Sequence, residues 1–144
     1  MTSEALALIN AFVLGLFSGS LLTEAFVLVP FWQTLRPDEF FAFHRDFGNR
    51  LFRYFAPLTI AASALPIALA VWDGGLNLSA NISALASLIT LSFFPLYFLK
   101  ANQAFHDRQV SNDDLPKQLK IWACVHAVRT LFAVVAFCSA LHAI

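Results

Sequence analysis

Charged residues are scarce in this sequence: Asp, Glu, Lys and Arg together make up 12% of its 144 residues. Soluble domains contain about 25% charged residues, so the composition argues strongly against a water-soluble globular protein. Nine basic and nine acidic side chains cancel to a net charge of zero. Because there is no basic surplus, we expect no nucleic-acid partner.

The sequence also contains only two cysteines and no nucleotide-binding motif. Cys124 and Cys138 fall on one predicted helix, where their separation is about 21 Å, too far for a disulfide. The absence of a Cys-x-x-Cys pair argues against a thiol-redox site or a zinc ribbon. The sequence also has no Gly-x-Gly-x-x-Gly or P-loop motif, so it gives no support for nucleotide chemistry.

Hydrophobic residues, in contrast, make up 59% of the chain and include 16 phenylalanines. A helix that crosses a bilayer needs about 20 apolar residues. Four apolar segments are predicted as spans, at about residues 5–29, 54–72, 80–99 and 119–143. The sequence therefore predicts an all-α fold, an integral membrane four-helix bundle made of a single transmembrane domain over residues 1–144.

A charged stretch precedes the second predicted span. Pro37, Asp38 and Glu39 are typical of a first helical turn, since proline fits an early helical position and acids favour the positive end of the helix dipole. No helix breaker follows for several turns. We therefore expect an amphipathic helical extension that leads directly into the second span.

Basic residues cluster in two of the three connections. The first connection contains Arg36, Arg45, Arg50 and Arg53, and the third contains Lys100, Arg108, Lys117 and Lys120. Because cytoplasmic loops are enriched in Lys and Arg, we predict that these connections face the cytoplasm and that both termini lie on the non-cytoplasmic side. The expected location is a cell membrane, such as a bacterial inner membrane, which the chain crosses several times.

Small and aromatic residues give two further expectations. Gly15 and Gly19 form a Gly-x-x-x-Gly pair, a spacing that lets membrane helices approach closely. This face can pack within the bundle, or against a second copy or a partner in a larger membrane complex. Trp32, Trp72 and Trp122 lie near predicted span boundaries, as in an aromatic belt.

Three ionisable residues fall inside predicted spans: Glu24, His126 and Arg129. A charge at a helix centre costs about 2.5–3.5 kcal/mol on insertion scales, so such residues suggest a functional site. A stripe of the fourth span contains Trp122, His126, Arg129, Ala133, Ala136 and Ala140. Because a His–Arg stripe facing lipid would be costly, we expect this face to point into the bundle.

Four more polar residues are expected at the same level of the bundle. The candidate catalytic residues are Glu24, His126, Arg129 and Asn102, and the candidates for binding any cofactor are His44, His106 and Asn49. Each has a purely structural alternative. Glu24 and Arg129 can form a salt bridge that fixes helix register, and His126 can be a packed, hydrogen-bonded histidine.

The sequence leaves the cofactor open, with no cofactor, a haem and a transition metal all compatible with it. Three histidines and a carboxylate can hold iron, copper or zinc. Two histidines on different helices can ligate a haem, with Arg129 or Arg50 pairing a propionate. However, no Glu-x-x-His motif places two ligands on one helix.

Two segments resemble a known family. The segment GLFSGSLLTEAFVLVP runs from Gly15 to Pro30, and WACVHAVR runs from Trp122 to Arg129. Together with Asn112 upstream of the second segment, they resemble the anthrone-oxygenase-like family of small four-helix membrane proteins. Many members of that family have no known function.

The resemblance implies an oxygenase that converts an anthrone to an anthraquinone with molecular oxygen. It further implies that His126 and Glu24 remove a substrate proton and that Arg129 stabilises the developing oxyanion. We therefore expect a membrane-embedded oxidoreductase or oxygenase whose apolar, aromatic or phenolic substrate enters from the bilayer into an aromatic-lined cavity. The alternatives are a haem- or metal-binding electron-transfer protein and an accessory structural subunit of a membrane complex.

Overall fold

The computed structural model describes residues 3–144, which form four long helical rods without a strand. The rods run over Ser3–Thr34, Pro37–Trp72, Leu78–His106 and Leu115–Leu141, and each is long and apolar enough to cross a membrane. The predicted all-α, multi-pass membrane architecture is therefore confirmed at this level. Each rod extends beyond its predicted span at one end at least.

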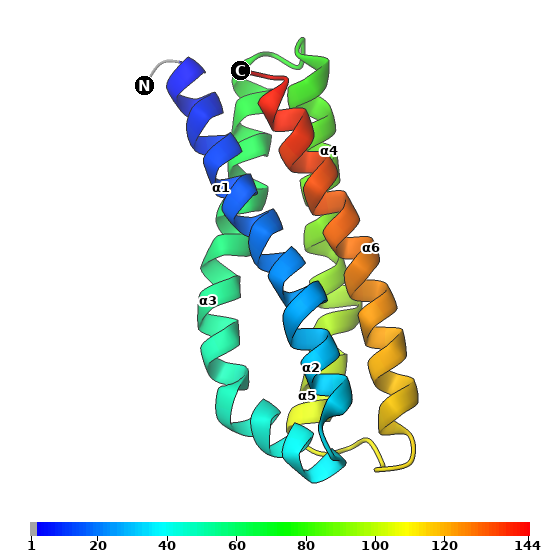
Figure 1. Cartoon of the computed structure of the whole chain (residues 1–144). Helices are drawn as coiled ribbons and strands as arrows, with labels where there is room; N and C mark the ends of the chain where they lie inside the picture. The colour runs from blue at the N-terminus through cyan, green and yellow to red at the C-terminus, as the bar shows by residue number, and fades with distance from the viewer. Residues whose placement is uncertain (1–2) are drawn as a thin grey trace.

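The rods form a closed ring of neighbours (Figure 1). α1 (Ser3–Thr23) packs against α3 (Pro37–Trp72) and α6 (Leu115–Leu141), and α4 (Leu78–Phe93) packs against the same two helices from the other side. Both chain ends lie beside the α3–α4 turn, at what we call the terminal end of the bundle. The α2–α3 and α5–α6 connections lie at the opposite end, which we call the loop end.

Two of the rods contain a π-helical segment. η1 (Glu24–Leu28) joins α1 to α2 (Val29–Thr34), and η2 (Phe94–Phe98) joins α4 to α5 (Leu99–His106). The amide of Val29 donates to the carbonyl of Glu24, five residues earlier. A proline ring clashes with the carbonyl four residues before it, and this wider turn lets the first rod continue through Pro30 to Thr34.

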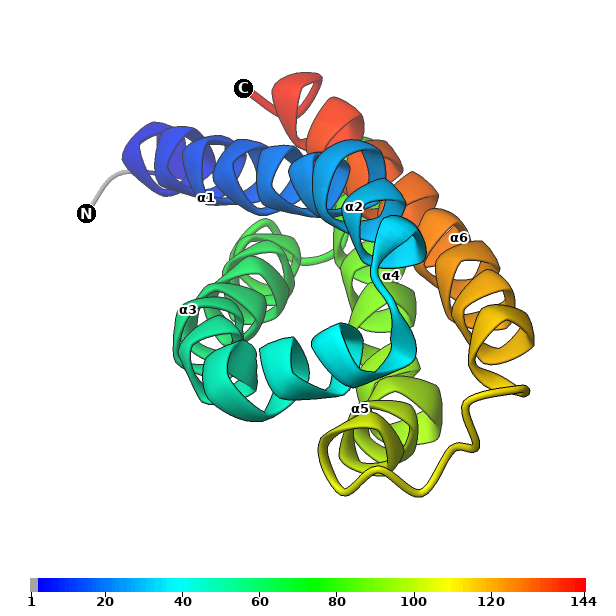
Figure 2. The same cartoon turned by 60° about the horizontal axis from the view of Figure 1, so that its bottom comes forward.

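The helical extension before the second span is present as part of one continuous helix, α3. Its first turn is capped, because the Glu39 carboxylate accepts from the backbone N–H of Arg36 at 2.9 Å. Pro57 and Pro66 lie inside the helix, where proline removes a backbone hydrogen bond and bends the axis. Figure 2 shows the first turns of α3 curving across the loop end toward α5.

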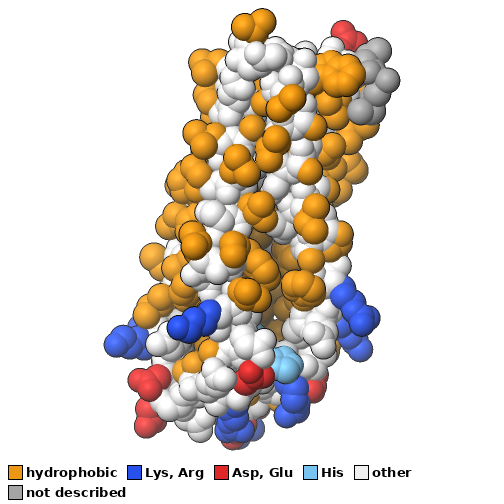
Figure 3. Space-filling view, turned by 180° about the vertical axis from the view of Figure 1, so that it is seen from behind, with side chains coloured by type: hydrophobic (Ala, Val, Ile, Leu, Met, Phe, Trp, Pro, Cys, Tyr) orange, Lys and Arg blue, Asp and Glu red, His pale blue; other side chains and the backbone are white. Residues whose placement is uncertain are grey.

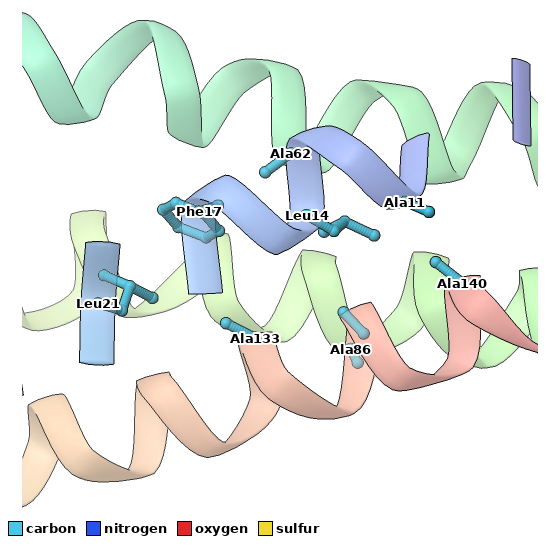
Figure 4. Close-up of a cluster of buried hydrophobic side chains, with 9 residues drawn as sticks. Ala11, Leu14, Phe17, Leu21, Ala62, Ala86, Ala133 and Ala140 are labelled. Atoms are coloured by element: carbon cyan, nitrogen blue, oxygen red, sulfur yellow. The ribbon is translucent and has the colours of Figure 1, made fainter. Parts of the chain in front are cut away.

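The buried core has three clusters, of which a small one nearest the terminal end consists of Leu6, Ala7, Leu69 and Ala80. The middle cluster, rich in alanine, consists of Ala11, Leu14, Phe17, Leu21, Ala62, Ala86, Ala133, Ala136 and Ala140 (Figure 4). The cluster at the loop end consists of Val29, Trp32, Phe40, Phe41, Phe98, Phe105, Leu115, Leu119 and Trp122. Alanine lets the helix backbones approach closely, which favours association inside a membrane. The prediction that this stripe of the fourth span faces into the bundle is thus confirmed for Ala133, Ala136 and Ala140, which are buried.

The two glycines of the Gly-x-x-x-Gly pair have different surroundings. A Cβ added to Gly15 would lie 3.1 Å from the Phe137 ring, a tight contact that the ring would have to relieve by shifting a few tenths of an ångström. A Cβ on Gly19 would meet open space. Gly19 lines an outward-facing groove of about 690 Å³ between α1 and α6.

The charged side chains gather at the loop end. Figure 3 shows Lys and Arg side chains around that end and a mostly apolar surface over the remaining length. Cys124 and Cys138 are both exposed and unpaired, as their spacing predicts. The aromatic-belt prediction is wrong for two tryptophans: Trp32 and Trp122 belong to the buried core, whereas Trp72 is 65% exposed.

Candidate functional site

Glu24, His126 and Arg129 lie in direct contact, although they are far apart in the sequence. Arg129 Nη2 donates to Glu24 Oε2 at 3.2 Å and lies 2.8 Å from His126 Nδ1. His126 Nδ1 is 3.7 Å from Glu24 Oε2. The side chains of Glu24 and Arg129 are 7% and 13% exposed, and that of His126 is 1% exposed. The structure therefore brings together the three ionisable residues that the sequence places inside the spans.

His126 is held at both ring nitrogens. Nε2 lies 3.0 Å from the carbonyl oxygen of Leu21, which can only accept, so Nε2 carries the proton. Nδ1 then offers its lone pair to the Arg129 guanidinium. Adding a proton to Nδ1 would place two cations 2.8 Å apart. In this arrangement His126 orients Arg129 and is not free to act as a base.

Only one of the two carboxylate oxygens of Glu24 makes polar contacts. Its ion pair with Arg129 and its contact with His126 both involve Oε2. Within residues 3–144, Oε1 makes no hydrogen bond. Glu24 opens the π-helical segment η1, a kind of segment often found at functional sites. This carboxylate therefore has one oxygen fixed and one available.

Arg129 is held over an aromatic ring. Its Cζ lies 4.1 Å from the centroid of the Phe98 ring, which belongs to the second π-helical segment, η2. Its Nε is buried and has no acceptor among the described residues. Both π-helical segments thus place a side chain on the same guanidinium, Glu24 from one side and Phe98 from another.

Asn102 is connected to this cluster only through Trp122. Trp122 stacks on His126 with ring centroids 5.0 Å apart and donates its indole N–H to Asn102 Oδ1 at 2.9 Å. Asn102 itself is exposed. It positions Trp122 and has no described contact with Glu24 or Arg129.

His44 packs against the aromatic cluster at the loop end. Its Nδ1 is 3.3 Å from the carbonyl oxygen of Phe40, and its ring centroid is 5.0 Å from that of Trp32. Trp32 in turn lies 5.4 Å from Trp122. Two tryptophan rings therefore separate His44 from His126.

The other two candidate cofactor residues lie at the surface. His106 pairs with Asp107 at 2.9 Å, and hydrogen bonds from His106 and Gln103 hold the pKa of the Asp107 carboxyl below its usual range. Asn49 is exposed. The structure places His106 close enough to His44 for their charges to interact, whereas no described contact joins Asn49 to either histidine.

The side chains present do not fit the metal and haem sites considered above. No group of three or more His, Cys, Asp or Glu residues close enough to hold a metal occurs within residues 3–144. For haem ligation a histidine must offer a free ring nitrogen, and both nitrogens of His126 are engaged. His44 keeps Nε2 available, but the one histidine whose charge acts on it, His106, is engaged by Asp107 through Nδ1.

The sequence reasoning missed the π-helical segments and the role of Phe98. The available signals are Pro30 and Pro95, which stand just after η1 and inside η2. In a sequence, such a proline indicates only the end of a span or a kink. The register shift that directs Glu24 and Phe98 toward Arg129 has no signature in hydropathy.

The surface is hollowed beside the middle of α3. Figure 3 shows the surface hollowed between α3 and α4 toward the loop end. Gly48 lies one turn from His44 on the inward side of α3, and a Cβ added to it would meet open space. Leu51 and Phe55 on the same side are only half-buried, whereas Ala62 and Leu69 nearer the terminal end are buried. The middle of α3 is thus less deeply buried than its part nearer the terminal end.

Comparison with known proteins adds no relative: no family model, no curated protein and no solved structure matches this chain. The resemblance to the anthrone-oxygenase-like family stays a prediction based on its two segments.

Proposed function

We propose that the protein is a membrane-embedded oxidoreductase of the oxygenase class that acts on an apolar aromatic or phenolic substrate. The observation that supports this proposal is the pairing of Glu24 with Arg129, in which one carboxylate oxygen and the buried Arg129 Nε have no partner among the described residues. A free base next to a free cationic donor is what removal of a proton from a weak carbon or oxygen acid requires.

The proposed roles differ from those implied by the family resemblance. Glu24 Oε1 is the proton acceptor, and the positive charge of the Arg129 guanidinium stabilises the oxygen on which negative charge develops. His126 is a positioning residue, since it holds the guanidinium through Nδ1 while Leu21 holds its Nε2. Trp122 and Phe98 provide flat apolar surfaces beside these groups.

The proposed reaction converts an activated methylene group to a ketone with molecular oxygen, so that the methylene and one dioxygen molecule give the ketone and one water molecule. Glu24 removes one proton, and the electron pair left on carbon is delocalised onto a ring oxygen near Arg129. A carbon–oxygen bond to dioxygen then forms, and protonation gives the substrate hydroperoxide. Loss of the second C–H proton together with hydroxide breaks the O–O bond. One oxygen atom stays in the ketone, the other leaves as water, and no further reductant is needed.

The proposed orientation puts the loop end in the cytoplasm and both termini outside, because the Lys and Arg residues outside the spans belong to the loop end. The membrane we propose is a cell membrane such as the bacterial inner membrane. An apolar substrate would reach Glu24 from the bilayer through the hollow between α3 and α4. The uncovered Gly19 surface is available to a second copy or to another membrane protein.

The direct test is oxygen consumption with an anthrone as substrate, using protein purified in mild detergent. We expect Glu24→Gln to lower turnover roughly 100-fold or more, since it removes a positioned base. Glu24→Asp keeps the charge and retracts the carboxylate, and it should also lower turnover. Glu4→Gln, an exposed acid at the terminal end, is the matched control and should leave turnover unchanged.

Three outcomes would overturn the proposal. Full turnover in folded Glu24→Gln and Glu24→Asp would remove Glu24 from the chemistry. An absorption band typical of haem, or stoichiometric metal by elemental analysis, would favour an electron-transfer protein instead. Complete inactivity of the wild type together with co-purification of a second membrane protein would favour an accessory subunit.

A further inference from the structure

Arg50 and Arg53 differ from the other arginines because neither forms an ion pair in the described chain. The remaining arginines each have a carboxylate partner, in the pairs Arg36–Glu39, Arg45–Asp46, Arg108–Asp38 and Arg129–Glu24. The two unpaired guanidinium groups are therefore the ones available to an anion from outside the chain.

These two arginines stand three residues apart on the exposed face of α3. Like charges at this spacing on a helix repel each other. The nearest acid along the helix, Asp46, is already engaged, since Arg45 Nε donates to it at 3.1 Å. An external anion bound between Arg50 and Arg53 would relieve this repulsion.

Arg50 and Arg53 lie at the depth where phospholipid headgroups are expected. The exposed face of α3 is apolar toward the terminal end, where Ile60 is 66% and Val71 is 74% exposed. It becomes polar at Arg53, about 28 Å along the helix from Trp72. A bilayer hydrocarbon core is about 30 Å thick, so Arg53 lies where the apolar layer ends if Trp72 marks the other boundary.

Aromatic side chains flank the pair. The Cζ of Arg50 lies 5.2 Å from the centroid of the Phe47 ring. Phe47, Phe52 and Tyr54 are 43%, 55% and 55% exposed. Rings beside basic residues are typical of helix surfaces that lie at the boundary between headgroups and acyl chains.

We propose that Arg50 and Arg53 form a binding site for the phosphate of an anionic phospholipid. Guanidinium groups bind phosphate oxygens through two parallel N–H donors, which favours arginine over lysine for this role. The acyl chains would follow the apolar face of α3 toward Ile60. This site is separate from Glu24 and Arg129, so the proposal does not depend on the proposed enzymatic activity.

The test is native mass spectrometry of the full chain, released from detergent after incubation with an equimolar mixture of phosphatidylglycerol and phosphatidylcholine. Wild type should retain phosphatidylglycerol in preference to phosphatidylcholine. We expect the double variant Arg50→Gln with Arg53→Gln to retain at least about tenfold less phosphatidylglycerol, as loss of two basic contacts implies. Arg50→Lys with Arg53→Lys should show an intermediate loss.

Lys117→Gln with Lys120→Gln is the matched control, because it removes two unpaired cations at the same spacing and at the same end of the bundle. It should retain the wild-type preference. Equal losses in both double variants would mean a diffuse charge effect and would overturn the site, as would unchanged retention in the arginine variant. Competition by soluble glycerol phosphate at equal concentration would mean a free phosphate site rather than a lipid site. Circular dichroism of each variant verifies that the helices persist.

Discussion

At the scale of single residues, the central feature is a charged pair buried inside an apolar bundle. Pairing of Glu24 with Arg129 was one of two alternatives for these residues, and the ion pair at 3.2 Å confirms the contact. The ion pair does not exclude a catalytic role for these residues, because Glu24 Oε1 and Arg129 Nε take no part in the pair. What the sequence could not reveal is that Arg129 also occupies the one nitrogen of His126 that could have acted as a base.

The pair leads to a prediction about stability. Removing one member of a buried ion pair leaves an uncompensated charge and typically costs about 3–5 kcal/mol. Glu24→Gln would leave Arg129 as a buried cation without a partner, so we expect it to lower the thermal unfolding midpoint in detergent. Glu24→Gln combined with Arg129→Gln should recover part of the loss.

The matched control for this measurement is Glu39→Gln, which breaks the exposed pair with Arg36 and should leave the midpoint unchanged. Equal midpoints for Glu24→Gln and wild type would show that the buried pair contributes nothing to stability. The activity measurements on Glu24 variants should accordingly be made well below their midpoints.

At the scale of helices, close contact between α1 and α6 fixes the site. Ser18 Oγ donates to the Ala133 carbonyl at 3.0 Å, and Gly15 admits the Phe137 ring. These contacts lie on the same two rods that carry Glu24 and Arg129. The small-residue spacing predicted close helix packing, but it could not reveal that Gly15 is used within the chain while Gly19 is not.

The two glycines give a matched comparison. A leucine at Gly15 would meet the Phe137 ring, and overpacking of this kind costs about 1–3 kcal/mol. We expect Gly15→Leu to lower the unfolding midpoint measured by circular dichroism in detergent, whereas Gly19→Leu should be tolerated in a monomer. A drop for Gly19→Leu alone, with loss of a dimer in cross-linking, would instead indicate that Gly19 packs against a second copy.

At the scale of the whole molecule, charge is concentrated at one end. The basic residues of the first and third connections come together at the loop end, although about 50 residues separate the two groups in the sequence. An even number of spans places both termini at the other end. This distribution predicts the orientation in the membrane.

Orientation can be measured with single cysteines in a chain whose native cysteines are replaced by alanine. Leu76 lies in the α3–α4 turn and is 91% exposed, and Asp113 lies in the exposed α5–α6 connection. A membrane-impermeant maleimide added to intact cells should label Leu76→Cys and leave Asp113→Cys unlabelled until the cells are opened. The reverse pattern would contradict the predicted orientation.

The sequence by itself determined the membrane class, the four helices and the inward direction of His126, because hydropathy and helical period depend only on local residue order. It also identified Glu24 and Arg129, since charges are conspicuous in apolar spans. Only the tertiary structure decided which polar residues meet. The π-helical segments turn Glu24 and Phe98 toward Arg129, while His106 and Asn49 stay at the surface. Such contacts depend on the rotation of each helix against its neighbours, which packing sets and composition does not.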